Sequence, residues 1–384
     1  MSRNTIPSSW SVKKISEVAV VTMGASPSST SYNDDKIGLP LIQGNADCAN
    51  RKTKPRIYTS EITKKCKVGD IIMTVRAPVG AISKSNHVAC IGRGVCAIDS
   101  KINNEFLYQS LVYHENSWGK LSQGSTFEAV SGSDIKGFKI SVPPLKEQEK
   151  IAEILSTWDS AIEKQEQLIE KKKEFKKGLM QILLSGEVRF KEFNDNWEKK
   201  KIGSILEEDK VIAVNPDINK RLTVRLNLKG IEKREIKSGE IEGATTHYTR
   251  RAGQFIYGKQ NLHKGALAII PNELDGFQSS SDLPAFNFNK DIYPLWFFYF
   301  ISRESYYTQL EKIATGTGSK RIQPKELFEI TIKTPEYDEQ VRIAEVLKEV
   351  DKEIELLEKE LEVLKLQKKG LMQRLLTGEV RVKV

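Results

Sequence analysis

The chain has 384 residues, of which 39% are hydrophobic and 29% are charged, and this length predicts two or three domains with substantial cores. Its formal net charge of +9 is compatible with a polyanionic partner such as nucleic acid, although solubility alone also explains a basic composition. We expect a soluble cytoplasmic protein, because the polar first ten residues exclude a signal peptide and the longest apolar run, Leu295–Ile301, is too short to span a membrane.

Residues 1–144 form the first predicted globule, with 18 Lys and Arg against 11 Asp and Glu. It opens with Trp10-x-x-Lys13-Lys14-Ile15, and short apolar runs between Gly and Pro at residues 68–82 predict strands joined by tight turns. An aromatic helical stretch follows at residues 106–113, so the globule is predicted to be α+β. Its cysteines, Cys48, Cys66, Cys90 and Cys96, contain no C-x-x-C spacing, which favours reduced thiols over a metal site.

Residues 145–189 form the first predicted long helix, which begins after Pro143-Pro144 and ends before Gly186. Its charges balance, with nine Lys and Arg against nine Asp and Glu. Apolar residues recur at coiled-coil spacing and predict a seam of Ile151, Leu155, Trp158, Ile162, Ile169, Leu179 and Leu183. Gln165, Lys172 and Lys176 interrupt this seam. A flanking row of Ile154, Ala161, Leu168, Phe175 and Ile182 predicts that the helix packs against more than one neighbour.

Residues 190–335 form the second predicted globule, with 23 Lys and Arg against 19 Asp and Glu. It opens with Trp197-x-x-Lys200-Lys201-Ile202, continues with glycine-punctuated apolar runs at residues 252–269, and has an aromatic helical stretch at residues 295–307. The order of these signals matches the first globule although little identity remains. A second α+β domain is therefore predicted.

Residues 336–384 form the second predicted long helix, which follows Pro335 and ends before Gly378. Here 10 Lys and Arg stand against 12 Asp and Glu, so the positive excess of the chain lies in the two globules. Lys368 is the one polar residue in a ten-position seam. The other nine positions are Ile343, Leu347, Val350, Ile354, Leu357, Leu361, Leu364, Leu371 and Leu375.

The two helices are copies of one sequence. Gln148–Arg189 aligns without a gap to Gln340–Arg381 at a constant shift of 192, with 23 identities in 42 positions. Two heptad-patterned copies of about 60 Å in one chain are expected to pair with each other as an antiparallel coiled coil, which gives the chain an internal pseudo-twofold symmetry. The alternative is that each helix packs on its own globule.

This arrangement resembles the specificity subunit of type I restriction–modification enzymes. The similar features are the P-P-L-K-E-Q-x-K-I-A-x-I-L helix start at residues 143–155, its weaker counterpart at residues 334–347, and the K-K-G-L-M-Q-x-L-L-[ST]-G-E-V-R helix ends. The Trp-x-x-Lys-Lys-Ile openings and the run at residues 68–82 add to them. The resemblance covers the whole chain, and one departure is Lys320-Arg321 where the first copy has Glu128-Ala129.

The resemblance implies a division of labour. Residues 1–144 and 190–335 would be target recognition domains that each read one half of a bipartite double-stranded DNA sequence. The helices 145–189 and 336–384 would set the unread spacer and dock two modification (methyltransferase) subunits, and two restriction–translocation subunits would complete the complex. The chain itself would be non-catalytic and hold no cofactor, with S-adenosylmethionine, ATP and magnesium bound by the partner subunits.

DNA-contacting residues are expected among the basic and amide side chains of exposed loops, where phosphate contacts outnumber base contacts. The candidates in the first globule are Arg51, Lys52, Lys54, Arg76, Arg93, Ser125 and Thr126. Those in the second globule are Arg221, Arg225, Arg250, Arg251, Lys259, Gln260, Lys320 and Arg321. Each of them can also be an ordinary surface charge.

Two other functions compete with this reading. One is a coiled-coil scaffold whose globules bind proteins, which the concentration of positive charge in the globules disfavours. The other is a stand-alone nuclease built on Pro216-Asp217 and Glu235-Ile236-Lys237, a loose pattern with no counterpart in the first globule. Methyltransferase and phosphate-binding-loop motifs are not found in the sequence.

Overall fold

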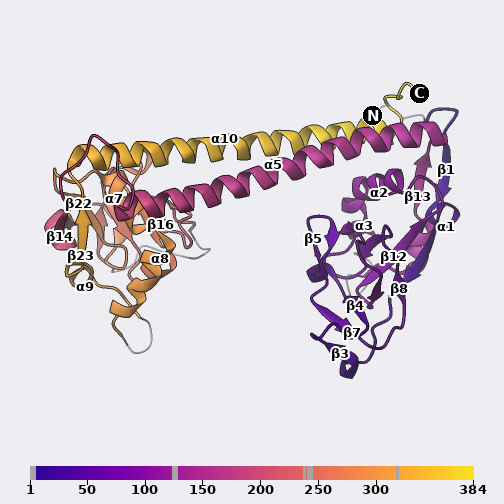
Figure 1. Cartoon of the computed structure of the whole chain (residues 1–384), viewed down its shortest axis with the longest axis horizontal. Helices are drawn as coiled ribbons and strands as arrows, with labels where there is room; N and C mark the ends of the chain where they lie inside the picture. The colour runs from indigo at the N-terminus through magenta and orange to yellow at the C-terminus, as the bar shows by residue number, and fades with distance from the viewer. Residues whose placement is uncertain (1–5, 123–128, 237–238, 240–244, 317–319) are drawn as a thin grey trace. The chain divides into compact units, whose positions relative to one another are not determined.

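The computed structural model describes residues 6–122, 129–236, 239, 245–316 and 320–384. The chain divides into two compact units, of which unit 1 comprises Met1–Glu166 and Lys359–Val384 and unit 2 comprises Gln167–Glu358. Each unit therefore contains one α+β globule together with half of each long helix (Figure 1). This division cuts across the long helices, whereas the sequence-based division keeps them as separate segments.

The globule of unit 1 is built mainly from short strands. Its strands are β1 (Ser11–Lys14), β2 (Ala19–Met23), β3 (Tyr32–Asn33), β4 (Leu39–Ile42), β5 (Cys48–Ala49), β6 (Lys52–Thr53), β7 (Ile57–Thr59), β8 (Lys65–Cys66), β9 (Ile71–Thr74), β10 (Ile82–Lys84), β11 (Ala89–Ile91), β12 (Val95–Ser100) and β13 (Lys139–Val142). Its helices are α1 (Ile15–Val18), α2 (Asn104–Tyr113), α3 (Glu115–Ser122) and α4 (Gly132–Gly137), with 3-10 turns at Ser29–Ser31 and Asn45–Asp47.

Two sheets and a helical layer enclose the core of unit 1. One sheet has the order β2-β12-β9-β10-β6-β5 and the other has the order β3-β7-β4-β11-β8. Side chains alternate across strand β9, as the strand period of two requires. Ile71 packs in a cluster with Leu107 of helix α2, whereas Ile72 packs in a cluster with Ile91 of the second sheet. The larger sheet is therefore covered on both faces.

The globule of unit 2 has the same kind of construction. Its strands are β14 (Glu198–Lys201), β15 (Leu206–Asp209), β16 (Leu222–Val224), β17 (Ile231–Lys233), β18 (His247–Thr249), β19 (Phe255–Tyr257), β20 (Leu267–Ile269), β21 (Gln278–Ser280), β22 (Ala285–Phe288) and β23 (Thr331–Thr334). Its helices are α6 (Ile202–Ile205), α7 (Pro294–Ile301), α8 (Glu304–Tyr307) and α9 (Pro324–Phe328), with 3-10 turns at Ile218–Lys220, Leu262–Lys264, Asn272–Leu274 and Thr308–Ile313.

The central sheets of the two units have the same strand order. In unit 2 the order is β15-β22-β19-β20, which corresponds to β2-β12-β9-β10 of unit 1. The alternation also repeats, because Phe255 and Tyr257 of β19 face the aromatic core with α7 while Ile256 faces a separate cluster. The repeated Trp-x-x-Lys-Lys-Ile segments form matching ribbons, with β1 paired to β13 and β14 paired to β23. The globules share a framework that their sequences alone barely reveal.

The long helices are α5 (Leu145–Ser185) and α10 (Tyr337–Leu376), and they run antiparallel (Figure 1). In unit 1 the early part of α5 faces the late part of α10, as the ion pair between Glu166 and Lys365 at 3.0 Å indicates. In unit 2 the reverse halves meet, with Lys173 and Glu358 at 2.8 Å. No helix in the described ranges is long and apolar enough to cross a lipid bilayer.

The predicted seam residues of both helices are buried or half-buried. Near the globules they join mixed clusters, such as Ile151, Leu155 and Leu375 around Phe106. The flanking row of α5 behaves differently along its length, because Ile154 and Ile182 pack against globule clusters whereas Leu168 and Phe175 are exposed. The second neighbour predicted for this row is thus a globule at each end of the helix.

A contact of three residues ties the globule of unit 1 to both helices, and we call it the Trp–Glu–Arg clasp. Trp10 Nε1 donates a hydrogen bond to the Glu147 carboxylate at 3.2 Å, and Arg381 Nε donates to the same carboxylate at 2.8 Å. Glu147 is 3% exposed. Gly378 allows this packing, since its φ of 77° suits glycine and a Cβ there would lie 2.6 Å from Pro7.

The clasp recurs in unit 2 with the same residue types. Trp197 Nε1 donates to Glu339 at 3.0 Å, while Arg189 donates through Nε at 2.9 Å and through Nη2 at 2.8 Å. The clasp explains why three separated signatures repeat together, namely the tryptophan opening, the helix-start glutamate and the G-E-V-R helix end. It fixes where each globule begins relative to the helices of its own unit.

Candidate nucleic-acid interface

Several strands of unit 1 end at one place, which we call the strand-end corner. There Val75 N donates to Gly94 O at 2.9 Å and Val130 N donates to Val75 O at 3.1 Å. The next residue after Val75 is Arg76, whose side chain is exposed, and the residue before Gly94 is Arg93, which is also exposed. Two of the predicted DNA contacts are therefore brought onto neighbouring segments.

The turn that carries Arg93 depends on its two flanking glycines. A Cβ at Gly94 would lie 2.1 Å from Gln43 O, so the turn can press against the end of β4 only with glycine there. Arg93 N donates to Ser26 Oγ at 3.1 Å, and its Nε lies 3.4 Å from the same oxygen. Ser26 and Gln43 thereby join the corner, although no sequence pattern indicated them.

The strand-end corner exists in unit 2 with the same backbone hydrogen bonds. Lys259 N donates to Asp282 O at 3.0 Å, and Ile322 N donates to Lys259 O at 2.8 Å. Gln260 therefore takes the place of Arg76, and it is exposed. Arg321 Nη2 lies 3.7 Å from an Asp282 carboxylate oxygen. Three further predicted DNA contacts gather at this corner.

The two corners combine a constant frame with variable side chains. The paired hydrogen bonds hold the same backbone arrangement in each unit, while Arg76 corresponds to Gln260 and Ala129 corresponds to Arg321. Arg and Gln prefer different base edges, since Arg pairs with guanine and Gln with adenine. A shared frame with such exchanges can present different sequence preferences from the two units.

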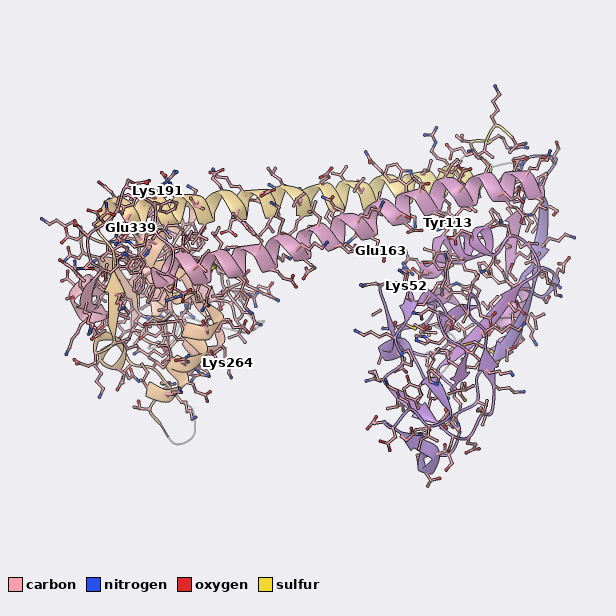
Figure 2. All side chains as sticks on the ribbon, in the orientation of Figure 1. Lys52, Tyr113, Glu163, Lys191, Lys264 and Glu339 are labelled. Atoms are coloured by element: carbon pink, nitrogen blue, oxygen red, sulfur yellow. The ribbon has the colours of Figure 1, made fainter. Side chains whose placement is uncertain are left out.

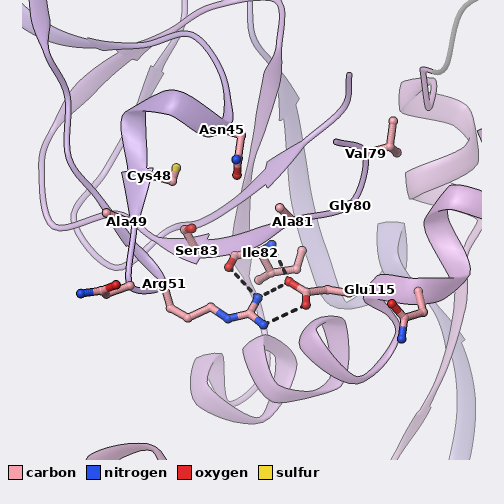
Figure 3. Close-up of a pocket in the computed structure, with 12 residues that line it drawn as sticks. Asn45, Cys48, Ala49, Arg51, Val79, Gly80, Ala81, Ile82, Ser83 and Glu115 are labelled. Atoms are coloured by element: carbon pink, nitrogen blue, oxygen red, sulfur yellow. Dashed lines mark hydrogen bonds and ion pairs between the residues drawn. The ribbon is translucent and has the colours of Figure 1, made fainter. Parts of the chain in front are cut away.

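Two candidates of unit 1 are engaged in contacts away from the corner. Arg51 lines a pocket of about 410 Å³ and binds Glu115 through both terminal nitrogens, one of them at 2.9 Å, while Nη1 also donates to Ile82 O at 3.1 Å (Figure 3). Lys52 Nζ lies 2.8 Å from Glu163 of helix α5, toward which it points in Figure 2. The contacts of Arg51 join parts of the globule, and the contact of Lys52 joins the globule to helix α5.

Of the other predicted DNA-contacting arginines of unit 2, two form ion pairs at the surface and two are buried. Arg225 pairs with Glu232 and Arg251 lies 3.6 Å from Asp275, both at the surface. Arg221 is 8% exposed and lines a pocket of about 450 Å³ together with other residues. Arg250 is the most enclosed, at 2% exposure, and burial lowers its pKa to about 10.

The contacts of Arg250 favour a structural role. Its Nε donates to Ser279 Oγ at 2.7 Å, Nη1 donates to Asp209 O at 2.7 Å and Nη2 donates to Leu283 O at 3.2 Å. All three nitrogens thus donate within the globule, and at 2% exposure the guanidinium is enclosed by protein. The predicted contact of Arg250 with DNA has no support from its geometry.

The remaining candidates differ in how far the structure describes them. Lys54 is exposed, and its amino group has no partner among the described residues. Lys320 is at the surface, 3.1 Å from Glu311. Ser125 and Thr126 lie outside the described residues.

Of the residues considered for nuclease chemistry, Asp217 has a local structural contact. Asp217 caps the turn Ile218–Lys220 by accepting from Asn219 N at 2.8 Å, a bond that lowers the pKa of its carboxyl. Lys237 lies outside the described residues. Within the described ranges no group of three or more His, Cys, Asp or Glu is placed to hold a metal ion, and the four cysteines are free thiols.

Comparison with protein families gives a match that repeats within the chain. The model for the type I restriction modification DNA specificity domain matches residues 7–171 and again residues 194–366. A putative type I restriction enzyme MjaX specificity subunit of Methanocaldococcus jannaschii is 36% identical over 191 residues, which is 48% of this chain and 45% of that protein. The MjaVIII specificity subunit of the same organism is 28% identical over 303 residues, covering 72% of this chain and 70% of that protein. The chain thus spans about half the length of the first of these relatives.

Solved structures share the fold along nearly the whole chain. The crystal structure of the S subunit of a type I restriction-modification system from M. genitalium has a TM-score of 0.58 at 16% identity, with 98% of both chains covered. A chain from a study of complex assembly and conformational transition of the type I R-M system has a TM-score of 0.57 at 16% identity, with 98% and 100% covered. At this level of identity the likeness concerns the fold.

Proposed function

This chain belongs to the type I restriction modification DNA specificity family, and we propose that its two globules each read one half of a bipartite double-stranded DNA target. The observation that carries the proposal is the pair of strand-end corners. They keep matched backbone hydrogen bonds while exchanging Arg76 for Gln260. Non-identical side chains on an identical frame should select non-identical half-sites, much as paired DNA-binding modules read paired half-sites.

We assign the long helices two tasks within this function. As a helix pair of fixed length they set the unread spacer between the half-sites, since the globules attach to them through the clasps. They also carry exposed apolar side chains: Leu168, Phe175 and Leu356 in unit 2, and Val363 and Leu366 in unit 1. Exposed apolar residues on a helix favour a protein partner, and we propose that methyltransferase subunits occupy them.

We further propose that the chain supplies sequence choice while its partners supply the chemistry. Two methyltransferase subunits would methylate the DNA, and two restriction–translocation subunits would act in the complete complex. Such work takes place in the cytoplasm, where the DNA is. The net charge of the globules, +7 for residues 1–144 and +4 for residues 191–335, suits their contact with DNA phosphates.

The proposal is tested by hydroxyl-radical footprinting of the chain in complex with its methyltransferase partner. Two protected patches separated by an accessible spacer are expected, and the affinity should fall steeply as salt is raised because phosphate contacts release counterions. One contiguous protected patch would contradict two separate readers. Affinity for duplex DNA that does not change with salt would instead favour a scaffold whose globules bind proteins.

A further inference from the structure

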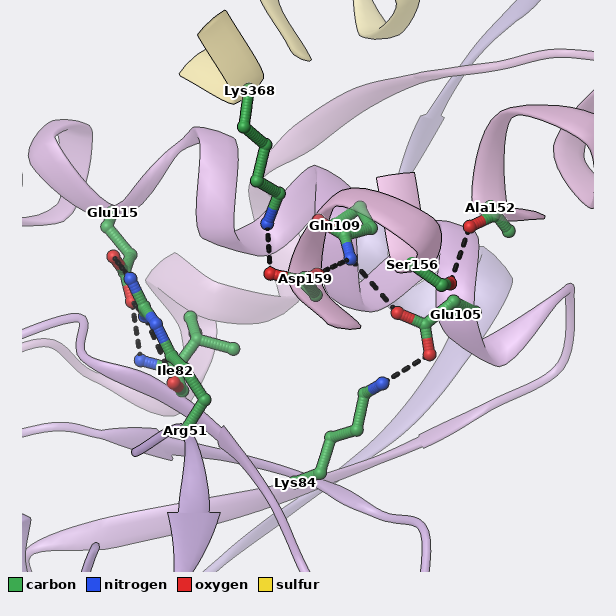
Figure 4. A network of polar contacts seen from close by, with 10 residues as sticks. All are labelled: Arg51, Ile82, Lys84, Glu105, Gln109, Glu115, Ala152, Ser156, Asp159 and Lys368. Atoms are coloured by element: carbon green, nitrogen blue, oxygen red, sulfur yellow. Dashed lines mark hydrogen bonds and ion pairs between the residues drawn. The ribbon is translucent and has the colours of Figure 1, made fainter. Parts of the chain in front are cut away.

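Two aspartates on the long helices occupy equivalent positions and belong to neither the clasps nor the corners. Asp159 lies on α5 and Asp351 lies on α10, separated by the repeat shift of 192. In unit 1, Asp159 Oδ1 lies 2.5 Å from Lys368 Nζ, and Oδ2 accepts from Gln109 Nε2 at 2.6 Å (Figure 4). One carboxylate thus joins α5, α10 and the globule helix α2.

The same junction exists in unit 2. Asp351 Oδ1 lies 2.5 Å from Lys176 Nζ, and Oδ2 accepts from the Tyr299 hydroxyl at 2.7 Å. Lys176 Nζ also lies 5.2 Å from the centre of the Tyr299 ring. Here α10, α5 and the globule helix α7 meet at one carboxylate.

The globule donors of the two junctions occupy equivalent positions. Six residues before Gln109, Asn103 N donates to Gln148 Oε1 at 3.1 Å. Six residues before Tyr299, Tyr293 N donates to Gln340 Oε1 at 2.8 Å. The donor is the amide of Gln109 in unit 1 and the hydroxyl of Tyr299 in unit 2, and each donates to Oδ2 of the aspartate in its unit. The hydrogen bond is therefore kept although the donor residue differs.

The lysines of these junctions stand where the seam would be better packed by an apolar residue. Lys368 is 8% exposed and is the one lysine among the buried residues of the described ranges, and the side chain of Lys176 is 23% exposed. A charged residue at a seam position lowers coiled-coil stability but specifies register and orientation. Its presence in both copies points to a positional role.

The sequence admits these junctions in one register only. In an antiparallel pair, facing residue numbers have a constant sum, and both 159 with 368 and 176 with 351 give 527. A slip of one heptad in either direction would place Asp159 opposite Leu361 or Leu375, and Asp351 opposite Ile169 or Leu183. A carboxylate facing an apolar side chain loses its partners, which opposes both slips.

We propose that Asp159 and Asp351 are positioning residues that hold each recognition domain and the helix pair in a single register, and so restrict recognition to half-sites at one separation. The statement about half-sites rests on the proposed function, whereas the statement about register does not. The tests are chosen to separate the two.

The first test measures methylation of DNA in which the two half-sites are separated by the native spacer or by a spacer one base pair longer or shorter. The chain is used in complex with its methyltransferase partner, either as wild type, as Asp159→Asn/Asp351→Asn or as Lys176→Met/Lys368→Met. The preference for the native spacer should fall by about tenfold in both variants, in the range of couplings between contacting residues. Lys150→Gln, which removes an exposed ion pair with Glu153, should keep the wild-type preference.

The second test reads the register without DNA, by zero-length carbodiimide cross-linking of the full chain and peptide mass spectrometry. Wild type should give the links Glu166–Lys365 and Lys173–Glu358, whose side chains are in contact. The Lys176→Met/Lys368→Met variant should add out-of-register links, because the native register then also places each aspartate opposite an apolar side chain and loses its advantage over the slipped registers. The exchange Asp159→Lys/Lys368→Asp should restore the native links in unit 1, because Gln109 Oε1 has no partner among the described residues and can accept from the new ammonium.

Failure of the register inference and failure of the proposed function give different results. Variants that are folded, give only native links and keep the wild-type spacer preference would overturn the inference. A wild type without any spacer preference would overturn the proposed function and the half-site part of the inference, while the cross-links would still decide the register.

Discussion

Arg76 and Gln260 are the side chains on which the proposed sequence choice most directly depends. Both are exposed, and each follows an equivalent strand of the central sheet. Replacing Arg76 by alanine should relax one position of one half-site by about 1–3 kcal/mol of discrimination and leave the other half-site unchanged. Gln260→Ala should relax one position of the other half-site and leave the half-site read by unit 1 unchanged. Methylation of half-site libraries measures this, and loss at both half-sites from either substitution would contradict it.

Replacing Arg250 should change stability and not sequence choice, because its guanidinium is buried and hydrogen-bonded inside the globule. Arg250→Met leaves the Asp209 and Leu283 carbonyls without this donor and should lower the free energy of unfolding by about 2–3 kcal/mol. Denaturant unfolding measures the effect, and Arg251→Met, at an exposed neighbouring position, is the matched control. An unchanged stability together with lost DNA binding would return Arg250 to the DNA-contacting set.

Glu147 of the first clasp should make stability depend on pH. Hydrogen bonds from Arg381 and Trp10 outweigh burial and lower the pKa of the Glu147 carboxyl below its ordinary value of 4.5. Its stabilisation is therefore present above that value and is lost as pH falls through the lowered pKa. Between about pH 5 and pH 3 the wild type should lose more stability than Glu147→Gln, as unfolding midpoints would show. An equal loss of stability in the wild type and in Glu147→Gln over this pH range would mean that folding does not change the pKa of the Glu147 carboxyl.

Sequence reasoning at this scale could not distinguish exposed side chains from enclosed ones. Arg76, Gln260 and Arg250 were all proposed as basic or amide side chains expected on exposed loops. The first two are exposed, whereas Arg250 is buried, and nothing local in the sequence indicates that its partners come from residues 209, 279 and 283. Asp159 and Glu147 were missed because a search for an apolar seam does not ask why polar positions also repeat. Identity at the shift of 192 was the available signal for both.

At the scale of elements, the long helices were predictable and the sheets were not. Proline and glycine positions predicted helix limits that agree with Leu145–Ser185 and Tyr337–Leu376, because those signals are local. The sheet order depends on pairings between distant strands, such as β12 between β2 and β9. Short apolar runs indicate that strands exist but carry no information on which of them pair.

Two leucines of α10 separate packing within the helix pair from docking of a partner. Leu361 is 8% exposed, and Leu361→Ala should lower the free energy of unfolding by about 2–4 kcal/mol. Leu366 is 70% exposed, so Leu366→Ala should change stability by less than about 0.5 kcal/mol but weaken binding of the methyltransferase subunit. Unfolding and co-purification measure the two effects. Full retention of the partner by Leu366→Ala combined with Val363→Ala would exclude the exposed apolar residues of α10 in unit 1 as the docking site.

At the scale of the whole molecule, the repeated parts and the varied parts have separate roles. The helix segments, the clasps and the aspartate–lysine pairs of the junctions repeat, and they fix each globule on its half of the helix pair. The central sheets repeat in strand order while their sequences differ, and the corners differ in the side chains they expose. Duplication followed by stronger divergence in the globules than in the helices leaves one chain with two different globules on similar helices, as the proposed reading of two half-sites requires.

The account is tested most directly by mapping methylated bases in the DNA of cells that express this chain with its methyltransferase partner. The same map is recorded for a variant in which residues 1–144 are replaced by the matching globule of another specificity subunit. A bipartite site with one fixed spacer is predicted for the wild type, and the variant should change one half-site while keeping the other half and the spacer. A contiguous site, or a variant that changes both halves at once, would contradict two independent readers on one helix pair.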